Sequence, residues 1–435
     1  MRRDTTLSNG PFVVQIHSAG NVPRMDITSD SDCYAMVWLE TCDGEMKSER
    51  KRTWCVRDSN EPVWGYCYIP LRCSLSPTDI LRLDLFDQDF ASADDKIGSL
   101  EVNASSLPIN GLIELPLKMK TSLRGAQKNN PAVVNLRAVP STRQKFRKDI
   151  FIMRHGKSKW NQAKESGDVA GMAHFDHGLD KSGVEQCSAF HAKLSEAGLP
   201  AENAFKRADV IFSSPLTRAV QTAVLALRGH ETFSSKGMVL CRNIREVKRT
   251  LVSFDTVGIE TGAESILAHA RKELDGMLDD ASLDNIFAQC MDKVDSNDTL
   301  SDWWTPSTER EASESVDIRV HYVMEMLKYM PHDSAILVGH NIFFRRFLRT
   351  YLSEAFKNEE PLLAENALYG KLSHAACCKL TIEFDPDPLK DDRILRLEPL
   401  FGSTFIPPAS ATNSDIKYAT SVSEMAASQS IAVDM

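Results

Sequence analysis

Arginine and histidine residues follow three apolar segments of the chain, each at a point where a short buried strand is expected to end. These residues are Arg154 and His155 after residues 150–153, Arg218 after residues 210–212, and His340 after residues 335–338. Guanidinium groups bind phosphate through paired hydrogen bonds, and a neutral imidazole is a nucleophile near pH 7. Ligands of open α/β sheets bind outside the carboxyl ends of the strands. We therefore expect these four side chains to converge on one anionic substrate.

The residues around these four side chains form three ordered motifs: Arg-His-Gly-x-Ser-x-x-Asn at 154–161, Ser-Ser-Pro-Leu-x-Arg-Ala-x-Gln-Thr-Ala at 213–223 and Gly-His-Asn at 339–341. With them, residues 149–408 resemble the histidine phosphatase superfamily, also called the phosphoglycerate mutase-like family. The resemblance implies a three-layer α/β domain and a phosphomonoester hydrolase in which His155 becomes a phosphohistidine. It also implies that Arg154, Asn161, Arg218 and His340 bind the phosphoryl group, with no cofactor needed for catalysis.

Glu246 is the candidate general acid, because the family takes the proton for the leaving oxygen from an acid after the second motif. A carboxyl group can donate this proton only if its surroundings raise its pKa toward the working pH. Many family members have a glycine shortly after this acid, whereas residues 247–251 contain none. The loop after Glu246 therefore departs from the family pattern.

Three functions fit these motifs. Lys157 occupies a position where phosphoglycerate mutases usually carry an acidic residue or glutamine, and it favours a phosphatase acting on a phosphorylated small molecule or phosphoprotein. A phosphoglycerate-type phosphomutase is the alternative enzyme, and a membrane adaptor that binds phospho-ligands without turnover is the alternative without catalysis. Residues 261–300 have helical spacing and form either a lid over the site or a helix pair packed on the domain.

The first third of the chain has the alternating pattern of β-strands, with Leu81, Leu83 and Leu85 separated by polar residues. Several such runs, separated by turn residues, predict an antiparallel β-sandwich. Acidic residues gather in two of the connections, and hard divalent cations prefer several carboxylate oxygens. The candidate metal ligands are Asp26 and Asp32 in one loop and Asp87, Asp89 and Asp95 in another.

Residues 11–139 resemble a C2 domain, the calcium- and lipid-binding sandwich, through these five aspartates and the turn Asn60-Glu61-Pro62-Val63-Trp64. Cys33 is a departure, because the family commonly has proline there. The resemblance implies that the domain binds Ca²⁺ and then an anionic phospholipid membrane, since the cation neutralises the acidic loops. The whole chain would then be a cytoplasmic enzyme that associates reversibly with membranes.

Composition agrees with two domains and sets limits on partners. The 435 residues are long enough for two cores, with a basic linker at 140–148 and a Ser- and Ala-rich tail at 409–435 that is expected to be disordered. A net charge of −9 argues against nucleic acid as a partner. No signal peptide or membrane-spanning stretch is apparent, and ten scattered cysteines fit a reducing compartment rather than a zinc site or disulfide framework.

Overall fold

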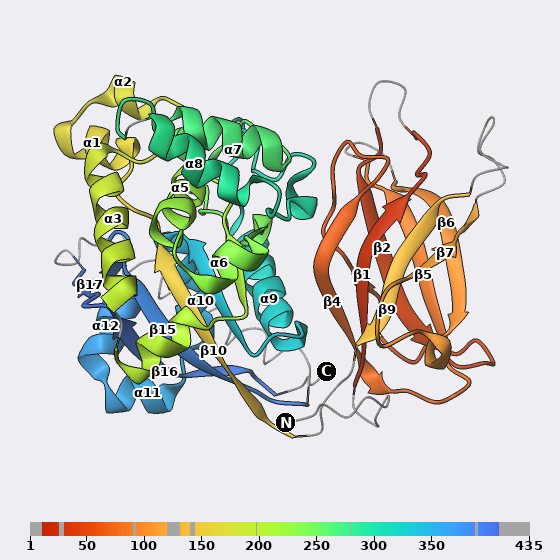
Figure 1. The fold of residues 1–435 in the computed structure, drawn as a ribbon. Helices are drawn as coiled ribbons and strands as arrows, with labels where there is room; N and C mark the ends of the chain where they lie inside the picture. Colours follow the sequence, from red (N-terminus) through yellow and green to blue (C-terminus); the bar gives the residue numbers. More distant parts are fainter. Residues whose placement is uncertain are drawn as a thin grey trace.

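The computed structural model describes residues 11–25, 30–89, 93–119, 131–139, 144–196, 198–278, 280–387 and 390–408. Asp26, residues 140–143 of the expected linker and the expected disordered tail lie outside these residues. The chain folds into an N-terminal β-sandwich and a C-terminal α/β domain (Figure 1).

The sandwich consists of two antiparallel sheets. The first has the order β4 (Val63–Ser74), β1 (Pro11–Gly20), β9 (Val133–Val139) and β7 (Ile113–Pro116). The second has the order β3 (Lys51–Arg52), β2 (Cys33–Glu40), β5 (Ile80–Asp87), β6 (Asp95–Asn103) and β8 (Lys118–Met119). The alternation read from the sequence is correct, because Leu81, Leu83 and Leu85 are fully buried between the sheets.

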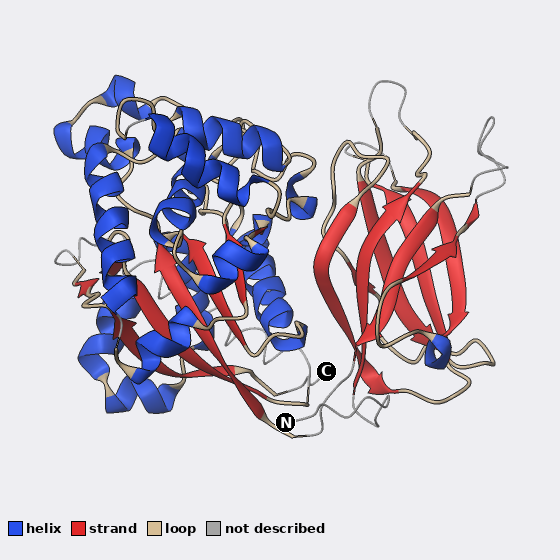
Figure 2. Ribbon diagram, in the orientation of Figure 1, coloured by secondary structure: helices blue, strands red, loops and turns tan. Residues whose placement is uncertain are grey.

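The α/β domain is built on a six-stranded mixed sheet with helices on both faces, as the strands and helices of Figure 2 show. The strand order is β12 (Val239–Leu240), β11 (Val210–Ser213), β13 (Ser334–Gly339), β10 (Phe146–Arg154), β15 (Cys377–Phe384) and β16 (Arg393–Leu400). A separate short pair joins β14 (Lys371–Leu372) and β17 (Phe405–Ile406).

The helices of the α/β domain follow the chain order α1 (Lys159–Ser166), α2 (Val169–Met172), α3 (Lys181–Glu196), α4 (Pro200–Lys206), α5 (Thr217–Ala226), α6 (Glu231–Lys236), α7 (Ala263–Lys272), α8 (Asp280–Met291), α9 (Ser313–Tyr329), α10 (Asn341–Tyr351), α11 (Glu354–Glu359) and α12 (Pro361–Tyr369). Short 3₁₀ turns occur at η1 (Ala104–Ser106), η3 (Arg242–Ile244), η4 (Phe254–Thr256) and η5 (Asn297–Thr299).

Successive residues of each central strand point to opposite faces of the sheet, and both faces are apolar. In β10, Ile150 and Ile152 pack with α9 and α10, whereas Phe151 and Met153 pack with α3 and α5. A strand covered on both faces must be apolar at every position. This explains why the strands read as uninterrupted apolar runs, and it gives the three layers expected from the sequence.

The segment 261–300 adopts the helix-pair alternative. Apolar residues of α7 and α8, among them Leu267 and Phe287, are buried in the same core as α5. The side chain of Gln221 on α5 also donates to the carbonyl of Ala270 on α7 at 2.8 Å. Residues 261–300 are absent from the described lining of the catalytic cavity, so the helices act as part of the domain wall.

The boundary between the domains differs from the sequence expectation. Strand β10 begins at Phe146 and so includes the last three residues, 146–148, of the segment expected to be a basic linker. Lys148 is buried, and its Nζ donates to the carbonyls of Leu327 and Met330 at 2.8 Å. The amine of this residue, expected to belong to the basic linker, thus satisfies carbonyl groups at the end of α9, where a cation is favoured.

The two domains touch through aromatic side chains. Tyr66 of β4 meets Phe212 of β11 edge to face at 5.2 Å between ring centroids. Trp54 meets Tyr322 of α9 at 5.1 Å, and the Tyr322 hydroxyl donates to the carbonyl of Arg52 at 2.8 Å. The sandwich therefore packs against both a helix and a strand of the α/β domain.

Candidate active site

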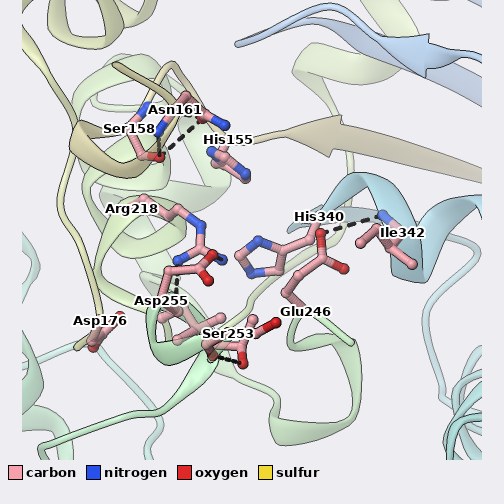
Figure 3. A network of polar contacts seen from close by, with 12 residues as sticks. His155, Ser158, Asn161, Asp176, Arg218, Glu246, Ser253, Asp255, His340 and Ile342 are labelled. Carbon is pink, nitrogen blue, oxygen red and sulfur yellow. Dashed lines mark hydrogen bonds and ion pairs between the residues drawn. The ribbon is translucent and has the colours of Figure 1, made fainter. Parts of the chain in front are cut away.

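The parallel pairing of three strands brings the predicted residues together. Arg154 at the end of β10 lies opposite Gly339 at the end of β13, and Ser213 at the end of β11 lies opposite Val338. His155 and His340 each follow one of these strand ends, and their rings lie 5.1 Å apart. Arg218 enters the same space from the first turn of α5, as Figure 3 shows.

His155 is buried and held in one orientation. Its Nδ1 lies 2.7 Å from the carbonyl of Gly156, which can only accept, so Nδ1 carries the proton and Nε2 keeps its lone pair. Burial lowers the pKa of His155 well below its ordinary value, and the nearby Arg218 charge lowers this pKa further. The ring is thus a neutral imidazole whose Nε2 can act as a nucleophile.

His340 is equally buried, but its hydrogen bonding is incomplete. Its Nε2 lies 2.8 Å from the hydroxyl of Ser214, whereas Nδ1 is buried without a hydrogen-bond partner among the described residues. Burial, followed by the charges of Arg218 and Arg154, holds the pKa of His340 well below its ordinary value. A buried polar atom without a partner costs free energy, and a ligand that hydrogen-bonds to it recovers that cost.

Arg154 and Arg218 are fixed by backbone carbonyls. The Nη1 atom of Arg154 donates to Leu372 at 2.7 Å, and that of Arg218 donates to the carbonyl of Asp255 at 2.6 Å. In the part of the chain that the structure describes, Arg154 Nε has no hydrogen-bond partner, and burial lowers the Arg154 pKa to about 10. The carbonyl groups orient both side chains, and Arg218 also forms an ion pair with the Asp255 carboxylate at 3.5 Å. The two guanidinium groups are thus positioned to bind an anion.

Glu246 lies at the amino terminus of α10, the helix that follows His340. Its carboxylate accepts from the backbone N–H groups of Val247 at 2.9 Å, Phe343 at 3.2 Å and Ile342 at 3.3 Å. Burial raises the pKa of Glu246, and these hydrogen bonds with the Arg218 charge oppose the rise without cancelling it. The direction of the shift is the one that a general acid requires.

Asn161 has two roles in the geometry. Its Oδ1 accepts from the N–H and hydroxyl of Ser158 at 3.2 and 2.9 Å, and its own N–H donates to that hydroxyl, which caps α1. The residue also lines the catalytic cavity. The capping hydrogen bonds use the side-chain amide oxygen of Asn161, so its NH₂ group is the donor that remains for a ligand.

Three supporting residues were not predicted from the sequence. The ring of His374 lies 6.0 Å from that of His155, and Asp255 holds Arg218. Asp176 accepts from the N–H and hydroxyl of Thr217 at 2.9 Å, which caps the helix that carries Arg218. Asp176 lies in the turn after the first motif, so its position was visible in the sequence, whereas no pattern marks His374 or Asp255.

The acidic residues of the sandwich gather at one end of it. Asp87 lies opposite Cys33 of β2 and Asp95 of β6, and its carboxylate accepts the N–H of Asp32 at 2.6 Å. Among the described residues, no group of three or more His, Cys, Asp or Glu could hold a metal ion. Asp26 lies outside those residues, and Asp89 contributes a backbone N–H bond to Asp94 at 3.2 Å. The carboxylates are suitable calcium ligands, but the described ones do not complete a site.

The two folds and the site define a C2 domain followed by a histidine phosphatase superfamily domain. The family model for the C2 domain matches residues 10–122, and that for the histidine phosphatase superfamily, branch 1, matches residues 150–249. The order agrees with the one expected from the sequence. The two matches therefore place a C2 domain and a histidine phosphatase superfamily domain in one chain.

Individual relatives cover one domain each. Human cytosolic phospholipase A2 beta is 32% identical over 96 residues, which is 22% of this chain and 12% of that protein. A C2 domain of a plant extended synaptotagmin 1 is 16% identical, with 30% of this chain and 92% of that chain covered and a TM-score of 0.25. A provisionally assigned alpha-ribazole-5'-P phosphatase from Escherichia coli is 14% identical, with 58% of this chain and 96% of that chain covered and a TM-score of 0.32.

Two further structural findings concern membranes and thiols. The described residues contain no helix long and apolar enough to cross a membrane. All ten cysteines are free thiols, and seven of them, such as Cys187 and Cys241, are buried in the hydrophobic cores. The structure therefore uses these seven thiols as apolar packing groups.

We expect His374 to make the α/β domain sensitive to acid. Burial lowers the His374 pKa from 6.5 to about 3, so the unfolded chain binds a proton that the folded chain refuses between those values. The free energy of unfolding should fall as the pH drops below about 6.5. In His374→Gln, the loss between about pH 7 and pH 5 should be smaller by up to ~2 kcal/mol.

This expectation is checked by urea unfolding followed by helical circular dichroism, because the helices described above lie almost wholly in the α/β domain. His174→Gln, at an exposed histidine, is the matched control. Identical pH dependence in wild type and His374→Gln would show that His374 does not carry the effect.

Proposed function

We propose that this chain is a phosphomonoester hydrolase that works through a phosphohistidine at His155. The observation that carries the proposal is the state of that imidazole: it is neutral, its Nδ1 donates its proton to the Gly156 carbonyl, and the guanidinium groups of Arg154 and Arg218 line the same cavity. A nucleophile and the charges that stabilise a transferring phosphoryl group thus occupy one cavity.

In the first step, Nε2 of His155 attacks the phosphorus atom and the bond from phosphorus to the leaving oxygen breaks. Arg154 and Arg218 stabilise the charge on the equatorial oxygens, and Glu246 gives its proton to the leaving oxygen. In the second step, the Glu246 carboxylate takes a proton from water. The resulting hydroxide attacks phosphorus, the P–N bond breaks, and neutral His155 and inorganic phosphate are formed.

His340 and Asn161 would hold the phosphoryl oxygens through both steps. The Ser214 hydroxyl accepts from the N–H of Leu216 at 3.3 Å, so its own hydrogen can be donated to Nε2 of His340. That arrangement leaves the His340 proton on Nδ1, the atom without a partner, where it would be a donor to the substrate. Because these groups and the arginines supply positive charge and donors, we expect hydrolysis of soluble substrate to continue in excess chelator.

Hydrolysis, phosphomutase activity and simple phospho-ligand binding differ in their products. A hydrolase releases inorganic phosphate, a mutase returns the phosphoryl group to a hydroxyl of the substrate, and an adaptor forms no phosphoenzyme. We favour hydrolysis on the strength of Lys157, whose position carries acidic residues or glutamine in phosphoglycerate mutases. The amine of Lys157 pairs with Glu165 at 2.5 Å.

His155→Ala should abolish turnover, because the variant lacks the Nε2 lone pair that attacks phosphorus. Wild-type enzyme quenched during turnover of a ³²P-labelled substrate should hold acid-labile, base-stable label, and the variant should hold none. His174→Gln, outside the cavity, should retain both label and phosphate release. Label that persists in His155→Ala would assign the nucleophile to another residue, and label without released phosphate would favour the mutase.

Glu246→Gln should slow substrates with poor leaving groups far more than an aryl phosphate, whose oxygen leaves without a proton. General acid catalysis contributes about 10²–10⁴-fold, so kcat/KM for an alkyl phosphate should fall by roughly that factor. The measurement is kcat/KM for an alkyl phosphate and for p-nitrophenyl phosphate in wild type and variant. Equal losses on the two substrates would indicate that Glu246 supports the loop instead of donating a proton.

We further propose that the C2 domain recruits the enzyme to anionic phospholipid in a calcium-dependent, reversible manner, from the cytoplasm. The support is the gathering of carboxylates at one end of the sandwich, where Asp32 and Asp87 are in hydrogen-bonding contact. Burial and the charges of Asp87 and Asp32 raise the pKa of the Cys33 thiol, a sign of concentrated negative charge. With Asp26, Asp89 and Asp95, these residues would hold Ca²⁺ and reduce the repulsion.

The combined change Asp32→Asn and Asp89→Asn should remove calcium-dependent sedimentation with phosphatidylserine liposomes. Asparagine keeps the size of each side chain but removes two negative charges, so the cation loses affinity. Asp43→Asn, at an exposed position beyond the opposite end of β2, is the matched control. Equal sedimentation of wild type with and without calcium would mean that the domain binds lipid or protein independently of the cation.

A further inference from the structure

The catalytic cavity contains more positive charge than one phosphate group requires. It has a volume of about 330 Å³, and its lining includes the carboxylates of Glu246 and Asp255. The latter already contacts Arg218. The cations that line it are Arg154, Lys164, Arg218, Arg249, Arg345 and Lys371.

Arg154 and Arg218 lie beside His155 and account for the phosphoryl group that is transferred. The four other cations reach the cavity from four separate parts of the fold: Lys164 from α1, Arg249 from the segment after Glu246, Arg345 from α10 and Lys371 from β14. Several cations on one solvent-exposed helix face would need no explanation. Here the cations come from four separate elements, and bringing them together costs electrostatic repulsion.

Within the described part of the chain, Lys164, Arg249 and Lys371 form no ion pair with a carboxylate, in contrast to their neighbours. Lys157 pairs with Glu165, and Lys159 pairs with Glu273 at 2.8 Å, although both lie within two turns of Lys164. Burial, followed by the charges of Arg154, Lys164 and Arg345, lowers the pKa of Lys371. Acidic partners are therefore available nearby but are used outside the cavity.

We propose that the substrate is a small molecule with a second phosphate group, bound by Lys164, Arg249, Arg345 and Lys371 while His155 attacks the first. The proposal rests on the function proposed above and names the substrate class of that site. A second phosphate would neutralise the excess cations, much as the first neutralises Arg154 and Arg218. The volume suits a small bisphosphate, because ligand pockets of about 300–1,000 Å³ enclose small molecules.

Arg249 has a particular place in this arrangement. It lies three residues after Glu246, in the loop that lacks the glycine found in many family members, and it is exposed at the rim of the cavity. A long cationic side chain at this position can reach over the cavity, whereas a glycine could not. The presence of Arg249 in a loop without this glycine would thus explain the preference for a substrate with two phosphate groups.

The test compares glucose 1,6-bisphosphate, glucose 6-phosphate and p-nitrophenyl phosphate as substrates of the full chain. Wild type should have a higher kcat/KM for the bisphosphate than for the monophosphate, by about tenfold or more, because each charge-assisted pair strengthens binding. The double variant Arg249→Gln with Lys371→Gln should lower the ratio of the bisphosphate kcat/KM to the aryl phosphate kcat/KM by about tenfold. The matched control, Arg310→Gln with Lys181→Gln at exposed positions outside the cavity, should leave that ratio unchanged.

The outcomes separate this proposal from the one it rests on. If wild type hydrolyses none of the three substrates and forms no phosphohistidine, the proposed function itself is wrong. If p-nitrophenyl phosphate is hydrolysed but the bisphosphate shows no advantage, or the double variant and control change the ratio equally, the second-phosphate site is refuted. A phosphopeptide with acidic neighbours that outcompetes the bisphosphate would assign the cations to a protein substrate and overturn the small-molecule class.

Discussion

The burial of positive charge at the ends of three parallel strands is the constraint on which the rest of the site depends. Arg154 is 6% exposed and Arg218 is 2% exposed, and both are oriented by carbonyl groups. Burial, and after it the two guanidinium charges, lowers the pKa of His155 and of His340, so both imidazoles stay neutral. The same charges would favour an ionised Glu246, and only its burial keeps its pKa raised. The two imidazoles thus owe their neutral state to burial and to these cations together, whereas the acid owes its raised pKa to burial alone.

The scaffold that maintains this arrangement is built from backbone geometry more than from ion pairs. The register of β10 against β13 fixes the distance between the strand ends, and Asp176 caps the helix that presents Arg218. Thr222, on the same helix, accepts from the N–H of Gly156 at 2.9 Å and so connects the two motifs directly. Gly156 is in close contact with Gly183, because an added Cβ would lie 2.9 Å from the Gly183 carbonyl. A larger residue would displace the loop that orients the His155 ring.

Site residues that directly follow a buried strand could be predicted from the sequence. Residues that reach the site through contacts between distant parts of the chain could not. The apolar runs before His155, Arg218 and His340 predicted both the strands and the convergence of the side chains, because parallel strands align their carboxyl ends. His374 could not be found in this way, since it reaches His155 from the turn before β15, far along the chain. The same limit applies to Lys148. A basic run near a domain boundary resembles a linker in the sequence, and only the folded structure shows that the Lys148 amine is buried against carbonyl groups of α9.

The contact between the domains extends the influence of the C2 fold into the catalytic core. Val13, Tyr68 and Val139 of the sandwich belong to the same buried cluster as Phe212 and α9 of the α/β domain. Phe212 lies on β11, two residues before Ser214, whose hydroxyl contacts His340. Removing the sandwich would expose apolar surface beside the strand that orients the second histidine, and such surface is stable only when it is covered. The C2 domain therefore covers apolar surface next to the strand that leads to Ser214 and His340.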